Sequence, residues 1–299
     1  MIIAEGVMKS GRPVCVLGGA VLLLGLAAPA YADPGERYVS LGDSYTSGPL
    51  IPHATGKPAL CLRSDRNYPS LVADKIGAAS FTDASCAGAT TQDMTESQDL
   101  GVTENAPQFD ALKPDTTLVT LGIGGNDIGF GSIIVTCGTL SVGDPRGNPC
   151  EKKYTAGGDD QLADRIDATG PKITKAVKGI RERSPDARVI VVGYPRILPA
   201  SGPGCWPLVP ISAGDVPYLA GVEKKLNAML KTRAHDAGAA YAANYRAGHD
   251  LCEPPAAKWV EGIIPTMPAA PIHPNAAGMR ATARAVEAVA GVSSAASER

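Results

Sequence analysis

The chain has 299 residues, of which 19% are charged, and its formal net charge is −2. So small a net charge gives no electrostatic basis for binding nucleic acid or an anionic membrane. The length is sufficient for one large α/β domain behind a short targeting segment.

The N-terminal segment predicts export. Lys9 and Arg12 precede an apolar run at 14–28, and Ala30-Tyr31-Ala32 follows it. A charged region, an apolar region and an Ala-x-Ala cleavage site together are typical of a signal peptide. Cys15 lies near the start of the apolar run, which is not where the cysteine of a lipid anchor would stand.

These features set the expected domain organisation. We expect residues 1–32 to be a signal peptide and residues 33–299 to be one domain that is secreted to the extracellular space. The apolar run is short for a membrane span, and no later stretch is apolar enough to be one, so no stable membrane insertion is expected. A monomer is the default expectation.

Predicted strands and helices alternate along the rest of the chain. The pattern predicts strands at 38–42, 80–83, 116–122, 188–193 and 239–244, and helices at 68–76, 161–183, 218–237 and 275–289. Residues 96–111 are expected to be partly helical, 138–160 to be a polar excursion rich in Gly and Pro, and 199–217 to be an irregular loop. Such alternation indicates a three-layer α/β/α fold with a central, mainly parallel sheet, as in flavodoxin-like folds. Ligands of such sheets bind beyond the carboxyl ends of the strands.

A candidate nucleophile follows the first strand, in Gly42-Asp43-Ser44. A serine just past the end of a strand, with glycine allowing a sharp turn, is how α/β enzymes expose a nucleophile. Glycine, aspartate and serine also favour ordinary turns, so the tripeptide alone does not establish catalysis.

A serine nucleophile needs a base and donors for the developing oxyanion. Of four histidines, His273 stands out because the prolines of Pro271-Ile272-His273-Pro274 hold it rigid, just before a helix that Asn275 can cap. The other three have the ordinary interpretation of surface or hydrogen-bonded histidines: His53, His235 and His249.

Candidate oxyanion donors occur in two glycine-rich turns. Asn126 lies in Gly124-Gly125-Asn126-Asp127, directly after a predicted buried strand, and Gly88 offers a backbone N–H without a side chain. Neither a Gly-x-x-x-x-Gly-Lys loop nor a Gly-x-Gly-x-x-Gly turn is present, so a nucleotide site is not supported. An amide held by glycines at the sheet edge can instead donate to an oxyanion.

The four blocks around Ser44, Gly88, Asn126 and His273 resemble, in order, those of the SGNH hydrolases, also called the GDSL lipase/esterase family. The spacing of the cysteines is similar to that of the secreted actinobacterial branch of lipases and phospholipases A1. The resemblance implies that Ser44 is the nucleophile and His273 its base. It also implies an oxyanion hole formed by the backbone N–H groups of Ser44 and Gly88 and the side chain of Asn126, with no cofactor.

Six cysteines follow the expected cleavage site, an even number that is typical of disulfides in an exported chain. Six cysteines allow 15 pairings. The resemblance implies sequential pairing: Cys61–Cys86, Cys137–Cys150 and Cys205–Cys252. Zinc is the rival interpretation, but there is no Cys-x-x-Cys pair or histidine cluster, so no metal is expected.

One position departs from the family pattern. The family usually has an aspartate three residues before the histidine, where this chain has Ala270. Some secreted relatives use a backbone carbonyl at that offset, so the resemblance implies that the Ala270 carbonyl orients His273. An inactive relative is the alternative.

The expected function is hydrolysis of carboxylic esters, with lipid acyl esters as the first choice of substrate. A carbohydrate O-acetyl esterase is the main alternative within the enzyme class, and a non-catalytic secreted binding protein is the alternative from another class. A serine protease has no support in motif order. The apolar loop 253–271 is one candidate wall for an acyl groove, and ordinary packing against the core is the other interpretation of it.

Overall fold

Five parallel strands form the central sheet, in the spatial order β2-β1-β5-β6-β7. They are β1 (Arg37–Gly42), β2 (Ser80–Asp83), β5 (Leu118–Gly122), β6 (Arg188–Val192) and β7 (Ala240–Ala242). β1 pairs in register with β5, so that Gly42 lies opposite Gly122 at the carboxyl edge. The prediction of an α/β fold with a parallel sheet is confirmed.

This computed structural model describes residues 35–291. The signal peptide expected at 1–32 lies outside the described residues. No helix within 35–291 is long and apolar enough to cross a membrane.

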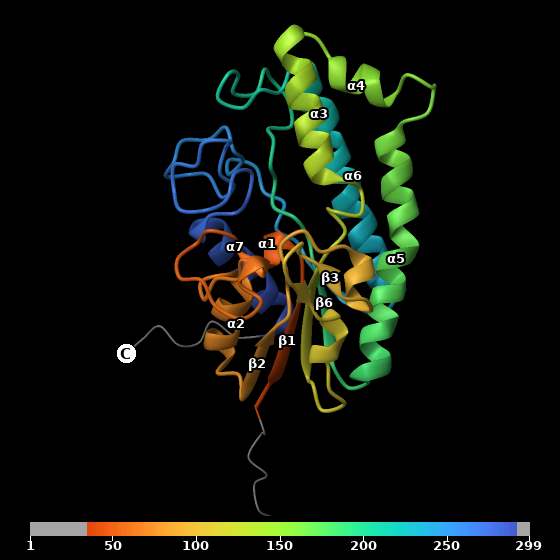
Figure 1. The fold of residues 1–299 in the computed structure, drawn as a ribbon, viewed down its shortest axis with the longest axis vertical. Coiled ribbons are helices and arrows are strands. Elements are labelled where there is room, and N and C mark those ends of the chain that lie inside the picture. Colours follow the sequence, from red (N-terminus) through yellow and green to blue (C-terminus); the bar gives the residue numbers. More distant parts are fainter. Residues whose placement is uncertain (1–34, 292–299) are drawn as a thin grey trace, which may run out of the picture. The chain divides into compact units, whose positions relative to one another are not determined.

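Two helix pairs cover the two faces of the sheet (Figure 1). α2 (Tyr68–Ile76) packs with α7 (Ala276–Ala290), and α5 (Gln161–Arg183) packs with α6 (Asp215–Asp236). Alternate strand residues enter the two cores, because successive side chains of a strand point to opposite faces. Tyr38 and Leu118 belong to the core under α2 and α7, and Val39 and Val119 to the core under α5 and α6.

The helices α5 and α7 were predicted from spacing, and each begins with a capping side chain. Asp160 accepts from the backbone N–H of Leu162 at the start of α5, and Asn275 accepts from that of Ala277 at the start of α7. Apolar side chains at helical spacing along the inner face of α5 are all fully buried: Leu162, Ile166, Ile173, Val177 and Ile180.

The segment expected to be an irregular excursion at 138–160 is partly helical. α3 (Phe130–Gly143) and α4 (Pro149–Tyr154) lie beyond the carboxyl ends of the strands (Figure 1). Glycine and β-branched residues give α3 a low intrinsic helix propensity, so the sequence pattern did not predict a helix here. Burial of Ile133 and Cys137 against the rest of the molecule favours the helix instead.

The segment 96–111 forms a small hairpin before its helical turn. Its strands are β3 (Gln98–Asp99) and β4 (Glu104–Asn105), and the 3₁₀ turn η3 covers Gln108–Ala111. Two further 3₁₀ turns are η1 (Ala59–Cys61) and η2 (Thr91–Met94). The expectation of partial helix therefore holds only for the last four residues of this segment.

The disulfides join the cysteines in sequential pairs. They are Cys61–Cys86, Cys137–Cys150 and Cys205–Cys252, as the resemblance implies. The first ties the loop after α1 (Ser44–Ser47) to the turn that carries Gly88. The second links α3 to α4.

Candidate active site

Ser44 begins a one-turn helix directly after the first strand. Asp43 caps this turn, because its side chain accepts from the backbone N–H of Tyr45 at 2.9 Å. Gly42 is required here: a side-chain carbon at Gly42 would lie 2.2 Å from the Thr46 hydroxyl oxygen. Gln108 fixes both polar groups of Gly42, donating to its carbonyl at 2.9 Å and accepting from its N–H at 2.8 Å.

His273 meets Ser44 across 229 positions of sequence. Its Nε2 lies 2.8 Å from the Ser44 Oγ, and its Nδ1 lies 2.7 Å from the carbonyl oxygen of Pro271. A carbonyl only accepts, so Nδ1 carries the proton and Nε2 is free to accept from the serine hydroxyl. Burial lowers the pKa of His273 below its ordinary value, although the bond to Pro271 opposes this.

The orienting carbonyl was predicted one residue too early. The Ala270 carbonyl does not bond to the ring nitrogen. It accepts a hydrogen bond from the backbone N–H of His273 at 3.2 Å, and this bond closes a tight turn. The turn places Ile272 in the left-handed region, at φ 58°. It therefore leaves the Pro271 carbonyl facing the ring.

A tyrosine beside the nucleophile holds the histidine loop. The Tyr45 hydroxyl donates to the carbonyl of Ile272 at 2.6 Å, and its ring centre lies 5.1 Å from that of His273. On the other side of the loop, the backbone N–H of Glu261 donates to the His273 carbonyl at 3.0 Å. The backbone of the loop that carries His273 is thus held by both contacts.

Two of the expected oxyanion donors lie at the same cavity, and a hydrogen bond ties one of them to the segment of the third. Ser44 and Asn126 line one cavity, and the Asn126 amide donates to the carbonyl of Ala89, next to Gly88, at 2.9 Å. That bond uses one amide hydrogen and leaves the second. Gly88 has a positive φ of 81°, which favours glycine.

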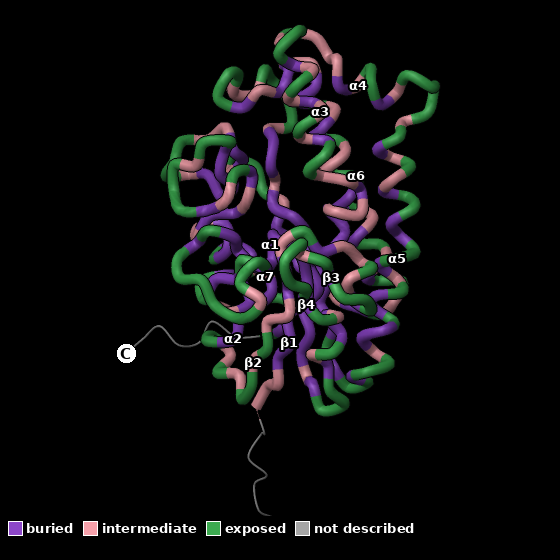
Figure 2. The backbone as a smooth tube through the Cα atoms, viewed as in Figure 1, coloured by how far each residue is buried: buried purple, intermediate pink, exposed green. Residues whose placement is uncertain are grey.

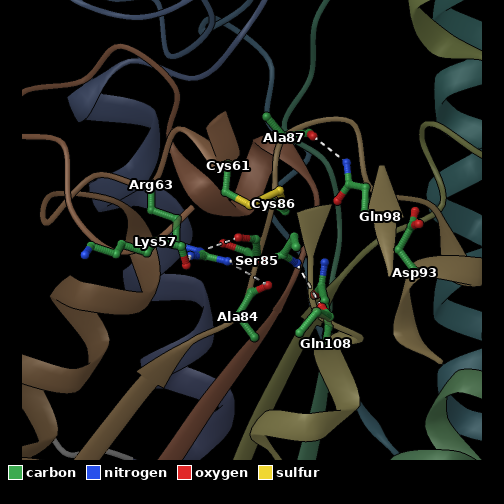
Figure 3. The surroundings of a disulfide bond; sticks show 12 residues. Lys57, Cys61, Arg63, Ala84, Ser85, Cys86, Ala87, Asp93, Gln98 and Gln108 are labelled. Carbon is green, nitrogen blue, oxygen red and sulfur yellow. Dashed lines mark hydrogen bonds between the residues drawn. A yellow bond between two sulfur atoms is a disulfide. The ribbon is translucent and has the colours of Figure 1, made fainter. Parts of the chain in front are cut away.

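The segment carrying Gly88 is anchored on both sides (Figure 3). Cys86 is bonded to Cys61, and the Gln98 amide donates to the Ala87 carbonyl at 2.8 Å. Arg63 donates to the carbonyls of Ser85 and Ala84 just before it, at 2.5 and 3.3 Å. This part of the site is therefore held rigid.

Sequence reasoning missed a buried link between the nucleophile turn and the asparagine turn. The Tyr194 hydroxyl donates to Asp43 at 2.5 Å and accepts from the backbone N–H of Gly125 at 2.8 Å. Burial raises the pKa of Asp43 to about 7, an effect that the bond from Tyr194 opposes. Tyr194 follows β6 at the carboxyl edge of the sheet, where ligands of such sheets bind. This position after a predicted strand could have marked Tyr194 as a site residue.

An apolar cavity opens beside Ser44, and α3, α6 and the segment after β6 enclose it. Its apolar lining is Tyr45, Ile128, Phe130, Ile133, Ile134, Tyr194, Ile197, Leu198, Leu219, Val222 and Leu226. The predicted acyl wall at 253–271 does not line it. In that loop Trp259 and Val260 are buried in packing, while Ile264 is 79% exposed. The wall of the cavity beside Ser44 comes instead from the unpredicted helix α3 and from α6.

The other three histidines do not join the site. His53 lies beside Asp65 at 3.5 Å, His235 is exposed on α6, and His249 stacks on Trp259 with ring centres 3.8 Å apart. In the part of the chain that the structure describes, no group of three or more His, Cys, Asp or Glu side chains is arranged to hold a metal ion.

Comparison with known proteins identifies the family of this chain. Residues 40–281 match the model of the GDSL-like lipase/acylhydrolase family. The chain belongs to this family. It is therefore a carboxylic ester hydrolase, as predicted.

Several proteins from Streptomyces are similar to this chain. Lipase 2 of Streptomyces coelicolor is 42% identical over 259 residues, which are 85% of each chain. An esterase of Streptomyces scabiei is 31% identical over 75% of this chain and 74% of its own. The solved phospholipase A1 of Streptomyces albidoflavus NA297 is 27% identical, with a TM-score of 0.69 over 85% of this chain and 99% of that one.

Proposed function

We propose that the protein is a secreted lipase that cleaves acyl esters through an acyl-enzyme on Ser44. The observation that carries this proposal is the 2.8 Å contact between Ser44 Oγ and His273 Nε2 at the mouth of an apolar cavity. Burial of an apolar chain in this cavity would contribute about 0.8 kcal/mol for each methylene group. An O-acetyl substrate has only a methyl group to bury.

In the first half of the reaction, His273 Nε2 takes the hydroxyl proton as Ser44 Oγ attacks the ester carbonyl. The Ser44 and Gly88 N–H groups and the free hydrogen of Asn126 stabilise the oxyanion. The carbon–oxygen bond to the alcohol then breaks, and the alcohol leaves with the proton from Nε2.

In the second half, water replaces the alcohol. His273 takes a proton from the water as its oxygen attacks the acyl-enzyme, and returns it to Ser44 Oγ when the carboxylic acid leaves. The Pro271 carbonyl holds the ring tautomer throughout. A neutral carbonyl stabilises the imidazolium less than an aspartate would, so the site works as a serine–histidine dyad.

Three disulfides and the absence of a membrane-spanning helix among residues 35–291 are consistent with secretion. We propose that residues 1–32 are removed on export and that the mature enzyme is a monomer. N-terminal sequencing of protein from the culture medium tests the first point, with Asp33 expected as the first residue.

The decisive experiment is hydrolysis of p-nitrophenyl esters from acetate to palmitate by the wild type and by Ser44→Ala. Activity that depends on Ser44 and rises toward longer chains is expected. The matched control is Ser80→Ala, an exposed serine at the amino end of β2, which should retain the wild-type rates. Activity confined to acetate would favour a carbohydrate esterase, and activity that survives Ser44→Ala would refute the proposal.

A further inference from the structure

Three neighbouring segments beside the cavity contain no charged residue. They are α3 at 130–143, the segment 197–214 and the segment 262–272, which ends directly before His273. The middle segment lies against the other two: side-chain carbons placed on Gly138 and Gly262 would lie 3.6 Å from Pro210 and 3.8 Å from Val209. We call these three segments together the uncharged rim.

The uncharged rim concentrates exposed apolar side chains. It carries seven of the twelve large apolar side chains that are exposed in residues 35–291. The seven, with their exposed fractions, are Val135 69%, Val142 70%, Trp206 38%, Leu208 75%, Ile263 39%, Ile264 79% and Met267 50%. In Figure 2 the loops at the upper left, which Figure 1 colours teal and blue, are largely exposed. A grouping of this kind, free of charge, marks an interaction surface.

The rim borders the cavity beside Ser44. A small apolar space lies where the three segments meet and is lined by residues of each, among them Gly138, Val209 and Ile263. Ile134, Ile197 and Leu198 line both this space and the cavity at the nucleophile. The rim therefore shares apolar wall residues with the cavity where an acyl chain would bind.

We propose that the uncharged rim docks on the surface of aggregated neutral lipid and delivers an acyl chain from that surface to Ser44. This inference rests on the proposed lipase function. An uncharged face matches a zwitterionic or neutral surface, since no charge has to be buried in the lipid and none attracts an anionic one. Leu208 and Ile264 are exposed enough to enter the acyl region, and Trp206 is of the type enriched at lipid–water interfaces.

The test is sedimentation of the protein with phosphatidylcholine vesicles, using Ser44→Ala so that no lipid is consumed. Leu208→Asp and Ile264→Asp, added singly, should each weaken vesicle binding by about tenfold, because each replaces an apolar insertion with a carboxylate. Leu208→Trp should strengthen it. The matched control is Val102→Asp, at a valine that is 89% exposed outside the rim, and it should bind like the parent.

All these positions are exposed, so the variants should keep the melting temperature of the parent. Equal binding by all variants would overturn the proposal, because the rim would then not contact the lipid. Loss of binding in about 0.5 M salt, where charges are screened beyond about 3–5 Å, would also overturn it, because the attraction would then be electrostatic and not apolar. Light scattering that shows a dimer in the parent and a monomer in Leu208→Asp would assign the rim to a second copy instead. Since vesicle binding is measured without hydrolysis, failure of docking and failure of the lipase function remain distinguishable.

Discussion

The hydroxyl of Tyr45 donates to the carbonyl of Ile272 at 2.6 Å, and this bond joins the residue after the nucleophile to the residue before the base. Ile272 has a φ of 58°, a conformation that costs a β-branched residue on the order of 1–3 kcal/mol. Contacts around the loop that carries His273 must therefore stabilise this backbone conformation. Tyr45 is therefore a positioning residue for His273.

Replacing Tyr45 with phenylalanine should lower kcat on a soluble ester roughly tenfold, because a small displacement of His273 weakens proton transfer. KM should change little. Steady-state kinetics on p-nitrophenyl butyrate check this. Tyr218→Phe is the matched control, since it removes a 2.9 Å bond to Asp160 outside the site. A change in KM alone, or equal effects of the two variants, would contradict the positioning role.

Asn126→Ala should lower kcat by about 10²–10³, the usual effect of losing one oxyanion donor. The loss falls on kcat because the donor acts on charge that develops in the transition state. The bond from Asn126 to Ala89 is also lost, so the melting temperature should be recorded alongside the kinetics. A kcat within twofold of the wild type (roughly 0.4 kcal/mol) would remove Asn126 from the proposed mechanism.

The pH dependence of kcat/KM should have an acidic limb with a midpoint below 6.5, because burial lowers the pKa of His273. The neutral ring accepts the serine proton, so activity rises as the pH rises through that pKa and is lost below it. Asp43 titrates nearby, and Asp43→Asn separates the two groups. A limb that persists in Asp43→Asn belongs to His273, whereas one that disappears would contradict the assignment.

Asp43→Asn should also change how stability depends on pH. Burial raises the pKa of Asp43 to about 7, so between about pH 4 and pH 7 the folded state holds a proton that the unfolded state has released. The free energy of unfolding of the wild type therefore falls as pH rises through this window, on the order of 4 kcal/mol from this group. Asparagine keeps the helix cap but does not ionise.

Urea unfolding at several pH values measures this difference. The stability of Asp43→Asn relative to the wild type should increase from pH 4 to pH 7 and then stay level. The other titrating groups are common to both proteins and cancel. A difference that is constant across the window would show that Asp43 does not carry the raised pKa.

Filling the cavity should change the preferred chain length. Val222 lines it from α6, and Val222→Trp should lower kcat/KM on p-nitrophenyl octanoate roughly tenfold or more relative to acetate, because each methylene kept out of the cavity loses about 0.8 kcal/mol. Val102→Trp, at an exposed valine, is the control and should leave the ratio unchanged. An unchanged ratio in Val222→Trp would place the acyl chain elsewhere.

The sequence by itself determined the fold class and the nucleophile turn, because both depend on local patterns. Apolar runs such as 118–122 predict buried parallel strands, and Gly42 before Asp43-Ser44 predicts a sharp turn at a strand end. Local patterns made His273, Gly88 and Asn126 separate candidates, and the family resemblance joined them into one site. The structure brings Ser44 and His273 within 2.8 Å.

Only the tertiary structure decided which groups complete the site. The Pro271 carbonyl, rather than that of Ala270, faces His273 because the turn uses the Ala270 carbonyl internally. Tyr194 reaches Asp43 from the segment after β6, and α3 forms part of the cavity wall despite its low intrinsic helix propensity. These features depend on contacts between distant segments, where packing overrides local propensity.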